Sequence, residues 1–243
     1  MKIAGAKVLL TGANGGIGRA FADELLRREA GKVYLGVRNA DGQTFPDDPR
    51  LEVVQLDVAD AASISAAAAK ASDVNILINN AGFAAFTGGI AAPSIDAARR
   101  EMDVNYFGPL QLTRALKESP VFSSAGAIIN IISFLGLATL PAAGTYSASK
   151  SAALALTRTL RAELRAKGTR VVAVLPVQVD TPMGAGLPEP RVKPAEVAAE
   201  ALDALETGLE EVFPGHLSKE AAAGFKADPA AVQARLSQFV RPI

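Results

Sequence analysis

The chain has 243 residues, 49% of them hydrophobic, and its 25 Lys and Arg residues balance 25 Asp and Glu residues. That length and composition allow a well-packed α/β domain, and the absence of net charge argues against nucleic acid or an anionic membrane as a partner. The chain has no cysteine and a single histidine, His216, which excludes disulfides, thiol nucleophiles and cysteine-bearing zinc sites, so we expect no metal site.

Short apolar segments rich in β-branched residues recur along the chain and predict the strands of a sheet. They cover residues 7–10, 32–37, 51–56, 74–79, 127–132 and 170–175. Because these segments are apolar almost throughout, we expect both faces of the sheet to be covered.

Helical patterns lie between the apolar segments. They cover residues 17–30, with Gly31 expected as a C-cap, the alanine-rich residues 61–71, and residues 146–167 before Gly168. Strands that alternate with helices predict an α/β fold with a Rossmann-type, doubly wound parallel sheet of about seven strands and helices on both faces.

We expect one domain over residues 1–243, with surface loops at residues 42–49 and 181–194. Residues 217–243 are expected to form a helical appendage of two short helices, broken at Asp228 and Pro229. The N-terminus leads directly into an apolar strand, and no apolar run reaches the ~18 residues that a membrane span needs. We therefore expect no targeting segment and a cytoplasmic location.

A glycine-rich turn, Thr-Gly-Ala-Asn-Gly-Gly-Ile-Gly at residues 11–18, joins the first strand to the first helix. Glycines let the backbone approach a pyrophosphate closely, and the free amides of the helix N-terminus stabilise its charge. The alternative is a tight turn with a purely structural role. The residues expected to hold a dinucleotide here are Gly12, Asn14, Gly15, Gly16, Ile17 and Gly18.

The end of the second strand indicates which dinucleotide is preferred. In this fold an acidic side chain at that position binds the ribose 2′-hydroxyl of NAD, and a basic one accommodates the 2′-phosphate of NADP. The chain has Val37, Arg38 and Asn39 there and no carboxylate, so we expect NADP(H) to be favoured over NAD(H). The alternative is that Arg38 is a solvated surface residue.

Several further motifs follow the glycine-rich turn in a fixed order. They are Asp57, Asn79-Asn80-Ala81-Gly82, Asn105, Ser133, and Tyr146-Ser147-Ala148-Ser149-Lys150. Together with Thr-Gly-x-x-x-Gly-x-Gly, this series resembles the short-chain dehydrogenase/reductase family over most of the chain.

The resemblance implies further cofactor contacts. Asp57 and Val58 would contact adenine, Asn80, Ala81 and Gly82 would lie on the ribose side, and Val179 and Thr181 would face the carboxamide. For Asn79 and Asn80 the alternative is that their side chains brace the central strands.

Tyr146 and Lys150 are four residues apart on a predicted helix, so their side chains share one face. A nearby ammonium stabilises a phenolate, which makes a tyrosine usable as an acid or base near neutral pH. The resemblance implies that Ser133 orients the substrate oxygen, that Tyr146 transfers the proton, and that Lys150 also binds the nicotinamide ribose. The alternative is an ordinary helix-entry tyrosine and a surface lysine.

Asn105 lies in a helical segment four residues before Pro109, whose ring displaces the carbonyl at that distance. The freed carbonyl can hold a water, which fits the family's asparagine in a proton relay to the lysine. The alternative is an asparagine that only caps or kinks the helix.

The chain departs from the family where Val177 follows Pro176 in place of the usual glycine, so contacts at Val179 and Thr181 are less firmly implied. Residues 83–89, 134–141 and the loop after Thr181 are expected to line an apolar substrate site, which the short loop leaves open. Phe83, Phe86 and Phe134 are equally consistent with core or interface positions, and we expect His216 on the surface.

The sequence thus predicts an NADP(H)-dependent oxidoreductase that moves a hydride between nicotinamide and a small-molecule carbonyl or secondary alcohol. A non-catalytic dinucleotide-binding regulator or redox sensor is the alternative, and an epimerase or dehydratase that retains its nicotinamide stays open. The resemblance implies a homodimer or homotetramer packed through the helices that carry Asn105 and Tyr146.

Overall fold

The predicted strands pair into one sheet in the structure of the chain, a computed structural model that describes residues 1–240. All neighbouring strands are parallel, in the order β3-β2-β1-β4-β5-β6-β7. The strands are β1 (Lys7–Thr11), β2 (Lys32–Val37), β3 (Leu51–Gln55), β4 (Ile76–Asn79), β5 (Ala127–Ile131), β6 (Arg170–Val174) and β7 (Glu211–Val212).

Helices follow most of the strands. They are α1 (Gly16–Arg27), α2 (Ala61–Lys70), α3 (Asp96–Met102), the π-helix η1 (Asp103–Phe107), α4 (Gly108–Ala115), α5 (Gly144–Leu164), α6 (Pro194–Thr207), α7 (Gly215–Ala227) and α8 (Pro229–Leu236). Short 3-10 turns are η2 (Pro120–Phe122), η3 (Phe134–Gly136), η4 (Pro141–Ala143), η5 (Arg165–Lys167) and η6 (Pro182–Gly184). Within the described residues, no helix is both long and apolar enough to cross a bilayer.

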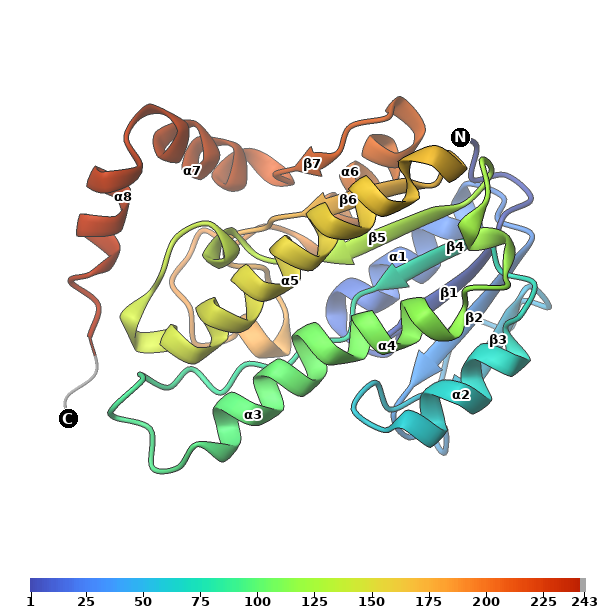
Figure 1. Cartoon of the computed structure of the whole chain (residues 1–243), viewed down its shortest axis with the longest axis horizontal. Helices are drawn as coiled ribbons and strands as arrows, with labels where there is room; N and C mark the ends of the chain where they lie inside the picture. The colour runs from blue at the N-terminus through green and yellow to red at the C-terminus, as the bar shows by residue number, and fades with distance from the viewer. Residues whose placement is uncertain (241–243) are drawn as a thin grey trace.

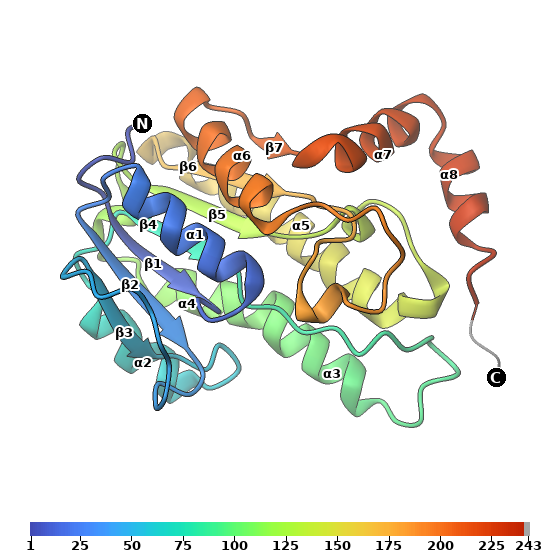
Figure 2. The same cartoon turned by 180° about the vertical axis from the view of Figure 1, so that it is seen from behind.

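The two faces of the sheet are covered by different helices, which gives three layers. Helices α2, α4 and α5 lie on the face seen in Figure 1, where Ile64, Leu112 and Leu160 join one buried cluster. Helices α1 and α6 lie on the face seen in Figure 2, where Phe21 and Leu202 join the other. This arrangement confirms the predicted Rossmann-type, doubly wound α/β fold.

Strand β1 pairs with both β2 and β4, and the strand order runs outward from it in both directions. In open parallel sheets such a reversal leaves a crevice beyond the carboxyl ends of the strands, where ligands bind. Thr11, Asn79 and Ile131 are the last residues of β1, β4 and β5 and therefore border this crevice.

One local prediction was wrong, and one strand was not located. Strand β7 was not recognised, because its two residues are too few for any periodicity to show. Helix α1 ends at Arg27 with Arg28 as its C-cap, and Glu29, not Gly31, has the left-handed φ of 62°. Gly31 is needed for close packing instead, because a Cβ there would lie 2.8 Å from the carbonyl oxygen of Gly5.

The tail contains two helices separated at Asp228, α7 and α8, and its residues 241–243 lie outside the described residues. These helices extend beyond the sheet in Figure 1 to the segment that follows β5. The ring of Phe225 meets Phe134 edge-on at 6.0 Å. Gln233 accepts a hydrogen bond from the Thr139 amide and donates one to its carbonyl, both at 2.9 Å. The tail therefore supports the loop that follows Ser133.

Candidate active site

The glycine-rich turn between β1 and α1 is packed against other backbone too closely for side chains at Gly12 and Gly18. Gly12 has a left-handed φ of 63°, and a Cβ on it would lie 2.9 Å from the Cα of Ala81. A Cβ on Gly18 would lie 2.2 Å from the carbonyl oxygen of Gly12. The N-cap residue of α1, Gly15, offers no side chain to the first amides of the helix. The turn thus has the close backbone and the uncapped helix N-terminus that a pyrophosphate needs.

Asn80 braces this turn from the neighbouring strand. Its Nδ2 donates to the carbonyl oxygens of Thr11 and Gly12 at 2.9 and 3.0 Å. The Thr11 hydroxyl accepts from the amides of Asn80 and Ala81, each at 2.9 Å. The side chain of Asn79 donates to Asn130 at 2.8 Å inside the core. Both asparagine side chains therefore have structural partners, as the bracing alternative requires.

The adenosine side of the crevice carries Asp57, Val58 and Arg38. Asp57 accepts from the Ala59 amide at 2.9 Å, and Val58 is buried. Arg38 follows β2 and is exposed, and its guanidinium makes no hydrogen bond within residues 1–240. Asn14 and Gly15 are exposed at the same end of the sheet. These residues lie where a dinucleotide can reach them.

The segment after β6 closes over the glycine-rich turn. The Cγ2 of Thr181 would lie 2.8 Å from a Cβ on Gly16, so Thr181 lies directly above the start of α1. Val179 is buried and pairs with Val192. Val177 has no left-handed φ, and its amide donates to Ser218 Oγ on α7 at 3.1 Å. The departure at Val177 is thus accommodated by an ordinary backbone conformation and a tail contact.

Ser133, Tyr146 and Lys150 come together beyond the carboxyl ends of β5 and β4. Lys150 is buried, its Nζ donates to the Ile131 carbonyl at 3.0 Å, and Nζ lies 5.6 Å from the centre of the Tyr146 ring. Ser133 is buried at the end of β5 and accepts from the Leu135 amide at 3.2 Å. The helical spacing predicted from the sequence thus places the tyrosine and the lysine side by side.

Burial disfavours the charged forms of both ionisable groups in this cluster. Burial raises the pKa of the Tyr146 hydroxyl above its usual value; the Ser133 side chain lowers this pKa, and the Glu101 carboxylate raises it further. Burial lowers the pKa of Lys150 to about 8. A lysine with that pKa can change its charge near neutral pH.

Asn105 lies in the π-helix η1, where the Gly108 amide bonds to the Asp103 carbonyl, five residues back. Its Oδ1 accepts from the Phe83 amide at 2.9 Å, and its Nδ2 donates to the Phe83 carbonyl and to Ser149 Oγ. The side chain therefore ties η1 to the segment after β4 and to α5. The predicted irregularity before Pro109 is present and takes the form of a π-helix.

A cavity of about 10 Å³ lies beside Asn105, Pro109 and Lys150. A volume near that of one water-sized sphere is at the lower limit for a buried water, and this cavity also has polar walls from Asn79 and Asn130.

Glu101 was missed by the sequence analysis. It is fully buried on α3, and its Oε1 accepts from the Ala85 amide at 2.9 Å. A charged residue in a short helix usually faces solvent, which hid it. The available signal was its spacing of four residues from Asn105, which puts both on one helical face.

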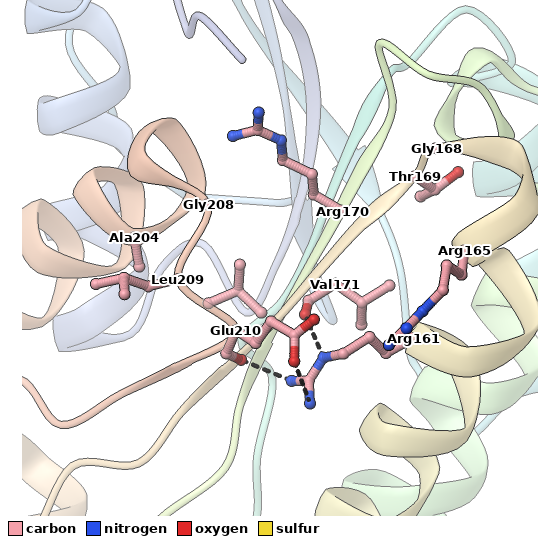
Figure 3. Close-up of a pocket in the computed structure, with 11 residues that line it drawn as sticks. Arg161, Arg165, Gly168, Thr169, Arg170, Val171, Ala204, Gly208, Leu209 and Glu210 are labelled. Carbon is pink, nitrogen blue, oxygen red and sulfur yellow. Dashed lines mark hydrogen bonds and ion pairs between the residues drawn. The ribbon is translucent and has the colours of Figure 1, made fainter.

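A separate hollow of about 310 Å³ lies at the amino end of β6, between the C-terminal ends of α5 and α6 (Figure 3). Arg161, Arg165 and Arg170 line it, but Arg161 is bound to the Glu210 carbonyl and Arg170 to the Leu205 carbonyl, both at 2.6 Å. Arg161 and Arg170 therefore serve the fold, whereas the side chain of Arg165 is exposed. His216 is exposed, as predicted, and no cluster of possible metal ligands occurs among residues 1–240.

A family model and known relatives match most of this chain. The family model for short chain dehydrogenase matches residues 6–191. Dehydrogenase/reductase SDR family member 7B of Mus musculus is 35% identical over 190 residues, which cover 72% of this chain and 58% of the relative. The chain thus spans less than two thirds of that relative's length.

Solved structures also resemble this chain over most of its length. A short chain dehydrogenase from Burkholderia cenocepacia in complex with NADP is 41% identical, with a TM-score of 0.92 and coverage of 97% of this chain and 99% of that one. The NADPH-bound carbonyl reductase from chicken fatty liver is 33% identical, with a TM-score of 0.74 and coverage of 83% and 91%.

Proposed function

The chain belongs to the short-chain dehydrogenase/reductase family, and we propose that it is an NADP(H)-dependent oxidoreductase that interconverts ketones and secondary alcohols. The observation that carries this proposal is the joint position of Ser133, Tyr146 and Lys150 beyond the strand ends, beside a turn whose backbone leaves no room for a side chain at Gly12 or Gly18. When bound, the nicotinamide supplies or accepts the hydride.

In the direction of reduction, Ser133 donates a hydrogen bond to the substrate carbonyl oxygen and orients it. The Tyr146 O–H bond breaks as its proton passes to that oxygen, while the carbonyl carbon gains a hydride. Lys150, whose Nζ lies 5.6 Å from the Tyr146 ring centre, stabilises the resulting phenolate when it carries a proton. The same ammonium would bind the nicotinamide ribose.

Asn105 is proposed to hold the water that returns a proton toward Lys150. The π-helix places it beside Lys150, and the cavity of about 10 Å³ between them has polar walls. The side chain of Asn105 already forms hydrogen bonds with Phe83 and Ser149. We therefore assign the water to its backbone carbonyl.

The preference for NADP is proposed from Arg38. Its guanidinium is exposed and has no protein partner within residues 1–240, at the strand end where the 2′-phosphate would lie. The relatives bound to NADP and NADPH are consistent with this assignment.

The Arg38→Ala variant should bind NADP roughly tenfold to a hundredfold more weakly and NAD about as well as before, because a charge-assisted contact is worth ~1.5–3 kcal/mol. Fluorescence titration with each cofactor measures both affinities, and the control is Arg165→Ala, an exposed residue in the turn between α5 and the amino end of β6. Equal losses for NAD and NADP would assign Arg38 to the fold.

The catalytic proposal is tested by mixing the protein with NADPH or NADH and a panel of ketones, and with NADP⁺ or NAD⁺ and the corresponding alcohols, while cofactor absorbance is followed. Turnover with NADPH is expected. Cofactor binding without turnover across the panel would instead support a non-catalytic regulator or redox sensor.

The proposal includes self-association and a cytoplasmic location. Phe107 on η1 is 43% exposed and Ile95, before α3, is 58% exposed, so this side presents apolar surface. We expect a homodimer or homotetramer, which analytical ultracentrifugation would detect.

A further inference from the structure

The peptide group between Pro176 and Val177, directly after β6, is held on both of its edges. The Phe134 amide donates to the Pro176 carbonyl at 2.8 Å, and the Val177 amide donates to Ser218 Oγ on α7 at 3.1 Å. This peptide bond is trans, so its N–H and C=O point in opposite directions. A rotation of the peptide plane would therefore break both hydrogen bonds.

Ser218 takes the place of a strand residue as the acceptor for Val177. The Leu175 amide donates to the Val212 carbonyl at 2.9 Å, in the ladder that joins β6 to β7. Two residues further on, the same register would give the Val177 amide to the Pro214 carbonyl. The chain instead turns into α7, with Pro214 as the N-cap, and the buried hydroxyl of Ser218 accepts from Val177. An amide at a strand end needs such a partner.

The first turn of α7 is fixed by contacts of its own with α6. The Gly215 amide and Lys219 Nζ both donate to Glu200 Oε1, at 3.1 and 3.0 Å. Ser218 lies between these two residues in the chain and is fully buried. Its hydroxyl is therefore a fixed acceptor, which holds the segment after β6 and does not follow it.

The same helix also supports the segment that carries Ser133. The ring of Phe225 on α7 meets that of Phe134 edge-on at 6.0 Å, and Phe134, Val177 and Phe225 belong to one apolar cluster. Phe134 follows Ser133 directly and is the donor to the Pro176 carbonyl. Helix α7 thus contacts both segments that this hydrogen bond joins.

The segment after β6 leads from these contacts to the glycine-rich turn. Its Thr181 lies above the start of α1, because the Cγ2 of Thr181 would lie 2.8 Å from a Cβ on Gly16. A dinucleotide with its pyrophosphate at the turn and its nicotinamide beside Ser133 and Tyr146 would therefore lie along residues 177–181.

We propose that Ser218 is a positioning residue for the nicotinamide half of the cofactor. By fixing the peptide group between Pro176 and Val177, Ser218 holds residues 177–181 and Ser133 in one relative position. The nicotinamide is thereby aligned with the substrate carbonyl that Ser133 orients. A misplacement of about 1 Å in such a site can lower the rate by ~100-fold. This inference rests on the proposed oxidoreductase function.

The Ser218→Ala variant removes the acceptor of the Val177 amide, so the peptide group keeps one hydrogen bond of two and populates other orientations. A ligand that needs the native orientation then binds more weakly, in proportion to the fraction lost. Isothermal titration with NADPH and with 2′-phospho-ADP-ribose, which lacks only the nicotinamide, separates the two halves of the cofactor. NADPH should bind roughly threefold to tenfold more weakly, and 2′-phospho-ADP-ribose should stay within about twofold. NADH and ADP-ribose are the equivalent pair if the protein prefers NAD.

Thr169→Val is the matched control, because it removes another buried hydroxyl, which donates to the Val121 carbonyl at the amino end of β6. It should leave both affinities unchanged. Ser218→Thr keeps the hydroxyl and should return NADPH affinity to within about twofold of the wild type. Urea unfolding shows which variants are folded, and if Ser218→Thr is not, the comparison of Ser218→Ala with Thr169→Val still decides.

Ketone reduction gives a second readout. At saturating NADPH, Ser218→Ala should lower kcat by a larger factor than it raises KM for the ketone, because alignment and not substrate binding is lost.

Equal weakening of NADPH and 2′-phospho-ADP-ribose in Ser218→Ala would overturn the proposal, because it would show that Ser218 only supports the fold. Unchanged NADPH affinity would overturn it as well. Absence of turnover on every ketone and alcohol would refute the oxidoreductase function, whereas the two titrations still report whether Ser218 acts on the nicotinamide half.

Discussion

Tyr146 and Lys150 are subject to the same physical effect with opposite signs. Burial raises the pKa of the tyrosine and lowers that of the lysine, so the protein environment favours the neutral form of each. A catalytic pair must nevertheless exchange a proton near neutral pH. Burying a lysine here therefore lowers the stability of the folded protein. Such a loss is typical of a residue that is kept for its function.

Tyr146→Phe removes only the hydroxyl that transfers the proton. Turnover should fall by at least the ~100-fold typical of lost general acid–base catalysis, while affinity for NADPH stays nearly unchanged. Steady-state reduction of the best ketone and fluorescence titration of NADPH measure the two quantities. Near-normal reduction by this variant would refute the assigned proton donor.

Lys150→Met should stabilise the protein without cofactor at neutral pH. The pKa of Lys150 falls from 10.5 to about 8 on folding, so its charge destabilises the fold fully below pH ~8, and this effect disappears as pH rises toward ~10.5. After allowing for the lost hydrogen bond to Ile131, the gain should be about 1–3 kcal/mol.

Urea unfolding at several pH values measures that gain, which should shrink above pH ~8. Lys226→Met on the exposed part of α7 is the control and should show no such pH dependence. A gain that is independent of pH would mean that side-chain packing, and not the charge, is responsible.

At the scale of elements, the turn between β1 and α1 requires particular glycines. Gly18→Ala would place a Cβ 2.2 Å from the Gly12 carbonyl oxygen, so the turn or the helix must shift. We expect a loss of about 1–3 kcal/mol in stability and at least roughly tenfold weaker NADPH binding. Gly224→Ala in α7, where a Cβ meets only Val232 at 3.9 Å, should instead be neutral or slightly stabilising. Equal effects of the two substitutions on cofactor affinity would contradict the close-packing explanation.

The elements that could be predicted from the sequence are those whose signals are local. Strands such as β2 and β5 are continuous apolar segments, and the four-residue spacing of Tyr146 and Lys150 specifies their shared helical face. The glycine-rich turn is likewise contained in eight adjacent residues.

What could not be predicted depends on contacts between distant parts of the chain. Gly31 looks like a helix C-cap, but its reason for being glycine is the Gly5 backbone. Glu101 looks like a surface residue until the Ala85 amide and α5 surround it. The structural partners of Asn79 and Asn80, on other strands, were also beyond the sequence, which left two roles open.

At the scale of the whole molecule, the loop after Thr181 and the tail both bear on the expected substrate side. The loop between Thr181 and α6 is short, as predicted, and is drawn together by Arg191, which pairs with Asp180 and bonds to Gly184. Helix α8 and the residues after it lie against residues 139–142. Gln233 binds Thr139, and the Phe239 carbonyl accepts from the Ala142 amide. The short loop and the tail together border the apolar segment 134–142.

We expect the enzyme to prefer aryl or bicyclic ketones to acetone-sized ones, because apolar surface contributes ~25 cal/mol for each Å² buried. The ratio of kcat/KM between the two substrate classes measures this preference. Gln233→Ala removes the tail's hold on Thr139 and should raise KM for the large ketones with NADPH affinity unchanged. A wild-type preference for the small ketones would contradict the open, apolar site.

The reversal of strand order at β1 also bears on the kinetics of folding. The seam between β1 and β4 joins residues far apart in the chain: the Lys7 amide donates to Asn75, 68 positions away. These strands can therefore pair only after a long loop has closed. Strands β1 to β3 and strands β4 to β6 are each joined by shorter crossovers and can assemble first. A dinucleotide bound beyond the ends of β1 and β4 would span the seam between these halves. Bound cofactor would then slow unfolding. The protein with its cofactor would persist longer in a cell than its free energy of unfolding alone suggests.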